Sequence, residues 1–113
     1  MKRVVVTGLG AITPIGNSLE AFLQGLQEGR SGANLITLFD ASLFKTRFAC
    51  EVKGFNPEDY LDKREVRRID RFSQFAIAAS AEAIRDSGLD LETVNKDRVG
   101  VICASGIGGL TTL

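Results

Sequence analysis

The two cysteines are the side chains of this chain with the greatest nucleophilic potential, and the sequence holds no histidine to activate them. Cys103 lies in an apolar run, VGVICA, three residues before Gly106. A reactive cysteine needs a helix N-terminus or a neighbouring cation that favours its thiolate, whereas an unactivated one packs like a small apolar residue. We therefore expect Cys103 to be a core residue, and Cys50 has an even weaker claim to a chemical role.

The absence of histidine limits the chemistry further. Without imidazole, neither a Cys–His nor a Ser–His pair can form, the commonest general base near neutral pH is missing, and zinc loses its usual nitrogen ligand. The two cysteines show no paired spacing and no accompanying metal ligands. The chain is therefore predicted to contain no catalytic residue and no metal site of its own.

Two glycine clusters could bring the backbone close to a ligand. Gly8-x-Gly10 follows an apolar run, as in dinucleotide-binding loops, but Thr13 replaces the third glycine of that pattern and Pro14 interrupts the phosphate-binding helix. This argues against a nucleotide cofactor, and no other cofactor is predicted. The second cluster, SGIGG at 105–109, fits either a tight strand-to-helix turn or a turn that presents Ile107 to an apolar ligand.

A basic segment is the third candidate for function. Five of the 14 basic residues fall between positions 63 and 71. On one continuous helix, four arginines would share a face, with an apolar or small side on roughly the opposite face (Arg64, Arg67, Arg68 and Arg71 against Val66, Ile69, Ser73 and Ala76). A solvated helix face is one explanation. Like charges at this spacing repel, however, so a face of one sign in a chain of zero net charge favours a docking surface for an acidic partner.

The elements that would position these residues follow an α/β pattern. The β-branched run from Lys2 to Leu9 predicts a buried strand, and a loop follows from 10 to 16. Asn17 is the expected cap of an amphipathic helix, with Glu20 completing an approximate capping box, and Gly29 is the expected end. The apolar stripe of this helix is Leu19, Phe22, Leu23 and Leu26.

The second half of the chain predicts helices followed by a strand. Residues 31–54 have mixed patterning, with one short strand expected near 48–53. A short helix should start at Asn56 and Pro57, and a long helix should run from 63 to 86 and close at Gly88. The alanine-rich part of that helix, 76–84, should be buried between layers. A strand at 98–104 would then pair in parallel with the first strand through a right-handed crossover.

Composition and length set outer bounds. At 113 residues, with 44% apolar and 25% charged residues, the chain can be at most one soluble domain. Zero net charge argues against a nucleic-acid partner, and no apolar run is long enough to span a membrane. Glycines and Pro14 interrupt the N-terminal apolar run too often for a signal peptide, so a cytoplasmic location is expected.

Several motifs in a fixed order resemble one family. VVVTGLGAITPIGN, SGANLITLFDASLFKTRFACEVKGFN, RRIDRF, DSGL and SGIGG occur in this order in the β-ketoacyl synthases, and the resemblance covers the chain end to end. It implies a thiolase-like α/β fold of α-β-α-β-α layers, usually in a homodimer. Residues 1–113 would be an incomplete, N-terminal portion of the N-terminal domain, and the family's nucleophilic cysteine and two histidines would lie outside them.

The resemblance also implies an activity and two sites. The family condenses malonyl-carrier protein with a cysteine-bound acyl group, and this portion alone should be inactive and should expose much apolar surface. Lys63, Arg64, Arg67 and Arg68 would contact acyl carrier protein, the expected partner, and Gly106, Ile107 and Gly108 would line the acyl pocket. Ala104 stands where the family has glycine. The alternatives are a non-catalytic partner subunit that sets chain length in polyketide systems and, more remotely, a nucleotide-dependent oxidoreductase.

Overall fold

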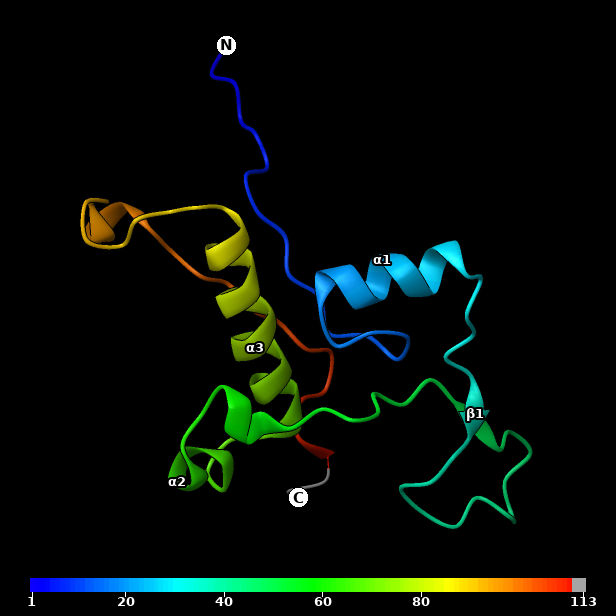
Figure 1. The fold of residues 1–113 in the computed structure, drawn as a ribbon. Helices are drawn as coiled ribbons and strands as arrows, with labels where there is room; N and C mark the ends of the chain where they lie inside the picture. The colour runs from blue at the N-terminus through cyan, green and yellow to red at the C-terminus, as the bar shows by residue number, and fades with distance from the viewer. Residues whose placement is uncertain (111–113) are drawn as a thin grey trace. The chain divides into compact units, whose positions relative to one another are not determined.

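The computed structural model describes residues 1–110, and its regular secondary structure is mainly helical (Figure 1). Its elements in chain order are α1 (Leu19–Gln27), β1 (Asn34–Leu35), β2 (Phe48–Ala49), the 3-10 helix η1 (Pro57–Asp59), α2 (Lys63–Val66), α3 (Arg71–Asp86) and the 3-10 helix η2 (Lys96–Arg98). The chain divides into two compact units. One is Ala11–Phe55, and the other joins Met1–Gly10 to the chain from Asn56 onward.

In the unit Ala11–Phe55, α1 forms where its apolar stripe predicts it, but its cap is not the expected residue. The Ser18 hydroxyl accepts a hydrogen bond from the Ala21 amide at 3.1 Å and so caps the helix. Asn17 instead donates its side-chain amide to the Lys53 carbonyl at 2.7 Å, which ties the start of the helix to a distant loop. The helix ends before Gly29, whose φ of 63° is the left-handed conformation that favours glycine, as predicted.

A two-stranded hairpin follows α1. β1 and β2 pair antiparallel, with Asn34 opposite Ala49 and Leu35 opposite Phe48, so the predicted strand near 48 is confirmed in its first two residues. Beyond β2, the Glu51 carboxylate accepts hydrogen bonds from the amide and hydroxyl of Thr37 at 3.0 and 2.7 Å. These bonds hold the pKa of Glu51 below its usual value, the side-chain bond contributing most. Charge-assisted hydrogen bonds between Thr37 and Glu51 thus hold the two sides of the hairpin together.

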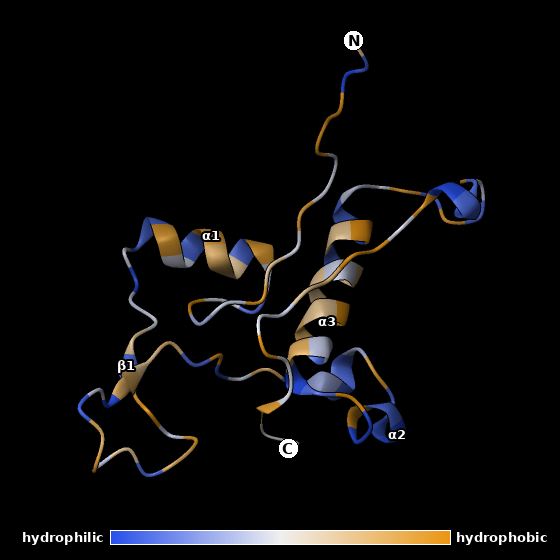
Figure 2. Cartoon of the chain, turned by 180° about the vertical axis from the view of Figure 1, so that it is seen from behind, coloured by the Kyte–Doolittle hydropathy of each residue, from blue (hydrophilic) through white to orange (hydrophobic). Residues whose placement is uncertain are grey.

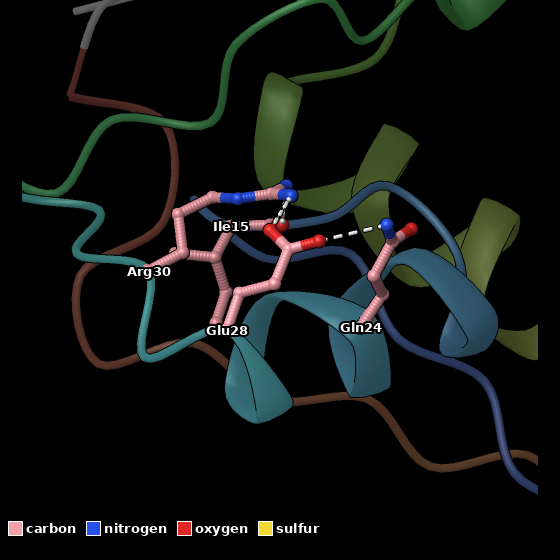
Figure 3. Close-up of polar contacts among 4 residues, drawn as sticks. All are labelled: Ile15, Gln24, Glu28 and Arg30. Carbon is pink, nitrogen blue, oxygen red and sulfur yellow. Dashed lines mark hydrogen bonds and ion pairs between the residues drawn. The ribbon is translucent and has the colours of Figure 1, made fainter.

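The end of α1 is fixed by a second polar cluster (Figure 3). The Glu28 carboxylate accepts hydrogen bonds from Arg30 and, at 2.8 Å, from the Gln24 amide. Arg30 also donates to the Ile15 carbonyl at 3.3 Å, which links the helix end to the loop before the helix. The hydrogen bond from Arg30 is the main reason why the pKa of Glu28 lies below its usual value.

In the other unit, the prediction of one helix from 63 to 86 is wrong. α2 ends after a single turn at Val66, and α3 begins at Arg71. Asp70 interrupts the helix because its backbone is extended, with φ −68° and ψ 156°, which is the conformation of a residue that precedes a helix. The short helix predicted at Pro57 is confirmed as η1, with the Asn56 side chain accepting from the Glu58 amide.

The two predicted strands of this unit, 2–9 and 98–104, are also absent, and so is their parallel pairing. Both segments lie outside every ladder among the described residues, and the side chains of Val4 and Ile102 are 91% and 96% exposed. A strand needs a partner for its backbone groups, and nothing in residues 1–110 supplies one. Figure 2 shows the apolar residues of the N-terminal segment running along an open stretch of chain.

Helix α3 organises this unit. Ala78 is 1% exposed and Gln74 is 7% exposed, whereas Ile77 and Ala81 face outward, so the alanine-rich part is buried along one line and not between layers. The N-terminal segment approaches the helix through its glycines, and the Leu9 amide donates to the Asp86 carboxylate at 2.8 Å. Gly88, with φ 65°, ends the helix as predicted. Among the described residues, no helix is long and apolar enough to cross a membrane.

Candidate functional site

The four basic residues predicted to dock a partner lie together at the bend between α2 and α3. We call residues 62–70 the basic elbow. Lys63 and Arg64 belong to α2, Arg67 follows its last residue, and Arg68 lies in the link to α3. All four side chains are exposed. The Lys63 ammonium lies 3.7 Å from the Glu58 carboxylate, an exposed ion pair that contributes little to stability. The elbow therefore presents four cationic side chains to solvent, together with the carboxylates of Asp62, Glu65 and Asp70, for a formal net charge of +1.

Hydrogen bonds from both sides fix the backbone of the elbow. At its start, the Asp62 carboxylate accepts from the amides of Arg64 and Glu65 at 2.7 and 2.9 Å. In its middle, the Arg68 amide donates to the Glu65 carbonyl at 2.9 Å. At its end, the side-chain amide of Gln74 donates to the carbonyls of two elbow residues. A four-residue helix is too short to persist alone, so these caps hold it in place.

The predicted face of four arginines does not exist as one helical stripe. Arg71 is the first residue of α3, beyond the break at Asp70, and its guanidinium carbon lies 5.0 Å from the centre of the Phe75 ring. In this cation–π contact the positive charge of Arg71 interacts with an aromatic ring of its own helix, α3. The chain changes element between Arg68 and Arg71, so the prediction of a shared helical face is corrected to a cluster on the elbow, with Arg71 outside it.

The second predicted site, the glycine turn at 105–109, is less enclosed than expected for a pocket wall. Gly108 adopts φ 86°, and its amide donates to the Ser105 hydroxyl at 3.2 Å. The side chain of Ile107 is 77% exposed, and no atom lies within 4 Å of the place where a Cβ of Gly106 would stand. The structure therefore shows the turn and leaves the role of Ile107 as a prediction.

The glycine turn lies against the first turn of α3, directly after the basic elbow. A Cβ built on Gly108 would lie 3.5 Å from the Phe72 ring. One built on Gly109 would overlap the Asp70 carboxylate. The two predicted sites therefore share one support, the residues that begin α3.

A shallow apolar groove of about 480 Å³ runs between α3 and the last described segment. Its lining residues are Phe72, Ser73, Ala76, Ile77, Ser80, Ala81, Ile84, Val101 and Cys103. Cys103 is exposed, so its prediction as a core residue is wrong here, because the segment that carries it is uncovered on its outer side. Its sulfur lies 3.9 Å from the Ser80 hydroxyl oxygen. Ile107 does not line this groove.

Gln74 is the residue of the site that the sequence analysis missed. It is the fourth residue of α3 and the one buried polar side chain in the described part of the chain. A signal was present in Asp70, which has the side chain of a typical helix cap and stands four residues before it. If Asp70 starts a second helix, the first helix must end before it. The last carbonyls of that first helix then need a hydrogen-bond donor from outside the helix.

Comparison with known proteins gives a consistent result. The sequence model of the family described as "Beta-ketoacyl synthase, N-terminal domain" matches residues 1–113. A curated relative from Synechocystis sp., named 3-oxoacyl-[acyl-carrier-protein] synthase 2, is 54% identical over 112 residues. These residues are 99% of this chain and 27% of that relative, so the chain spans about a quarter of the length of the curated protein it matches.

Solved structures give the same family. The ishigamide ketosynthase/chain length factor is 40% identical with a TM-score of 0.70, over 78% of this chain and 22% of that one. A type II polyketide synthase acyl-carrier protein in complex with its ketosynthase, bound to the hexaketide, is 33% identical with a TM-score of 0.63. That match covers 87% of this chain and 24% of the other. The likeness therefore extends from sequence to fold.

Proposed function

Because the chain belongs to the β-ketoacyl synthase family, whose N-terminal domain it matches over residues 1–113, we propose that it forms the opening part of a condensing enzyme of fatty-acid elongation. The observation that carries the proposal is the 54% identity with a 3-oxoacyl-[acyl-carrier-protein] synthase 2 over 112 residues. In the complete protein this part would belong to the first half of a thiolase-like, layered α/β fold, assembled as a homodimer.

The reaction proposed for the complete enzyme is a decarboxylative condensation. A cysteine thiolate attacks the acyl carbon of an acyl-carrier protein thioester and expels the carrier thiolate, which leaves the acyl group on the cysteine, a covalent-catalysis step. Loss of CO₂ from malonyl-carrier protein leaves a carbanion, which attacks the acyl-cysteine carbon and expels the cysteine thiolate. The product is a 3-oxoacyl chain two carbons longer. This chain holds no histidine and would supply binding surface, while the catalytic groups come from the rest of the enzyme.

The basic elbow is the proposed contact for acyl carrier protein. Four exposed cationic side chains, Lys63, Arg64, Arg67 and Arg68, lie on six consecutive residues whose backbone is held by hydrogen bonds at both ends. A fixed positive cluster attracts an acidic partner and speeds its association. One of the similar solved structures holds an acyl-carrier protein in complex with its ketosynthase, which supports this class of partner.

The glycine turn is the proposed contact for the acyl chain. Gly106 and Gly108 flank Ile107, whose apolar side chain is exposed in this chain and would meet the fatty tail in the complete enzyme. The positive φ of Gly108 allows the turn to double back and to present Ile107. Carrier contact and tail contact would then both lie at the start of α3.

A non-catalytic partner subunit that sets chain length is the second candidate, because one similar structure is a ketosynthase/chain length factor. The two candidates differ in whether the complete protein forms an acyl-cysteine. The complete protein is incubated with acyl-carrier protein that carries a radiolabel in its acyl group. Only the condensing enzyme keeps the label after denaturation, because only it forms the covalent acyl-cysteine. Absence of a covalent acyl adduct favours the partner subunit.

The test of the proposed function uses a chimeric synthase, in which residues 1–113 replace the matching region of the Synechocystis relative. We expect this chimera to elongate acyl-carrier protein with malonyl-carrier protein. In the chimera, Arg67→Glu should weaken carrier association roughly tenfold at low salt, chiefly through the on-rate, and the effect should shrink as salt screens the charges. Stopped-flow binding at several ionic strengths gives both rate constants.

A matched control has the same charge change elsewhere in the same unit. Arg98 is exposed and ends η2, so Arg98→Glu should leave carrier association unchanged. Equal association of the Arg67→Glu and parent chimeras at low salt contradicts the docking surface. A chimera that folds but makes no 3-oxoacyl product contradicts the proposed function.

A further inference from the structure

Gln74 is buried at the inner side of the basic elbow and makes two hydrogen bonds that no other side chain duplicates within residues 1–110. Its side chain is 7% exposed. The side-chain nitrogen donates to the Val66 carbonyl at 3.1 Å and to the Ile69 carbonyl at 3.2 Å. Both amide protons of Gln74 are therefore used on the elbow.

The two carbonyls that accept hydrogen bonds from Gln74 lie on either side of two arginines of the basic elbow. Val66 is the last residue of α2, and Ile69 lies one residue before Asp70, so Arg67 and Arg68 stand between the two carbonyls. The last carbonyls of a helix have no partner within the helix and need an outside donor. The side-chain amide of Gln74 is thus this donor, and by binding both carbonyls it fixes the distance between Val66 and Ile69, the two ends of the segment that carries both arginines.

The backbone of Gln74 adds a third tie. Its main-chain amide donates to the Asp70 carbonyl at 3.0 Å, the first turn of α3. The elbow is thereby attached to α3 at three carbonyls: Val66 and Ile69 through the side chain of Gln74, and Asp70 through the ordinary backbone bond of the first helical turn. A buried donor without a partner would be costly, so the bonds and the burial of Gln74 support each other.

We propose that Gln74 is a positioning residue for the carrier-protein contact, holding Arg67 and Arg68 in the arrangement that an acidic partner meets. This inference rests on the proposed function of the elbow and adds the residue that pre-forms it. Pre-formation matters because a flexible pair of arginines must be ordered at each encounter, which lowers affinity without removing any charge.

The test compares Gln74→Met with its parent in the chimeric synthase. Methionine keeps the length and volume of the side chain but cannot donate. We expect the KM for malonyl-carrier protein to rise roughly fivefold, from the loss of about one net hydrogen bond, with kcat unchanged. The control is Gln24→Met, since Gln24 lies on exposed α1 and donates only to Glu28 in the described structure, so its KM should not change.

A double-mutant cycle separates positioning from a general packing role. If Gln74 acts through the two arginines, adding Gln74→Met to a variant that carries both Arg67→Glu and Arg68→Glu should change the KM less than twofold, because both positioned charges are already lost. Additive losses contradict the inference. An effect of Arg67→Glu with no effect of Gln74→Met also contradicts it while leaving the docking surface intact, whereas no effect of either variant contradicts the docking surface itself.

A second variant covers failure to fold. Gln74→Leu has a similar size, carries no charge and cannot donate, so it should raise the KM about as much as Gln74→Met. Hydrogen exchange at the amides of Arg68 and Ile69, both bonded to Glu65, reports the elbow directly. Faster exchange there, with unchanged exchange in α1, is expected, and unchanged exchange at the elbow overturns the inference.

Discussion

Two glycine motifs flank α3, and they use the missing side chain for different physical reasons. At Gly8 and Gly10 a Cβ would overlap backbone atoms of the helix, so these glycines allow close approach. In the glycine turn, Gly106 has open space around it and Gly108 adopts φ 86°, so conformation and not space matters at Gly108, while the movable side chain of Asp70 limits space only at Gly109. Identical residues in similar sequence patterns thus serve packing in one place and chain reversal in the other.

The spacing between Gly8 and Gly10 matches the distance between successive turns of α3. Two residues of extended chain advance about 6.6 Å and four residues of helix advance about 6 Å, so glycines at alternate positions meet successive helical turns. Gly10 lies against Ala79 and Ala83, and Gly8 against Ala83 and Ser87. The pattern that suggested part of a nucleotide-binding loop is therefore a contact between an extended segment and a helix.

The largest effect that tests this comparison is expected at Gly10. Gly10→Ala places a methyl group against the backbone of Ala79, which cannot rotate away, and should destabilise the protein by about 2–3 kcal/mol. The midpoint of urea unfolding of the chimeric synthase measures it. The control is Gly100→Ala, since no atom lies within 4 Å of that position and its φ is not positive, and it should change stability by less than about 0.5 kcal/mol. Equal midpoints for the two variants would refute close approach at Gly10.

A smaller effect is expected in the second motif. Gly108→Ala forces a side chain into the left-handed region at φ 86° and should cost about 1–2 kcal/mol, measured by the same unfolding midpoint. Gly106→Ala serves as its control, because that residue has neither a positive φ nor a close neighbour, and should leave the midpoint nearly unchanged. If Gly106→Ala proves the more harmful, space and not conformation governs the turn.

The smallest effect concerns selectivity. Ile107→Phe enlarges the exposed apolar side chain of the turn and should lower kcat/KM for long acyl donors about fivefold more than for short ones. Elongation assays with a series of acyl-carrier proteins give the ratio. Carrier affinity should stay constant, since Ile107 lies outside the basic elbow. Equal losses at every chain length would indicate misfolding of the turn and would remove Ile107 from the acyl contact.

Local signals predicted the elements that local interactions form. The amphipathic repeat of α1, the proline start of η1 and the glycine ends at Gly29 and Gly88 depend on neighbours within a few residues. The cap of α1 was misplaced by one residue because Asn17 and Ser18 are both good caps. Only the distant Lys53 carbonyl, which binds Asn17, decides between them.

Predictions failed where distant partners decide the structure. Apolar β-branched runs predicted strands at 2–9 and 98–104, but a strand exists only when another strand pairs with it, and residues 1–110 supply none for these runs. The basic cluster was found from charge alone, whereas the break at Asp70 and the role of Gln74 depend on how α2 and α3 meet. Charge is visible in sequence, but the geometry that presents it is not.

The unpaired backbone of Val4 to Val6 has a consequence for self-association. These three valines are 91%, 63% and 80% exposed, and no ladder pairs them among the described residues. An extended apolar segment with unpaired amides and carbonyls is an edge on which a second polypeptide can add a strand. Gly8 and Gly10 lie against α3, so this edge is confined to the residues before Gly8.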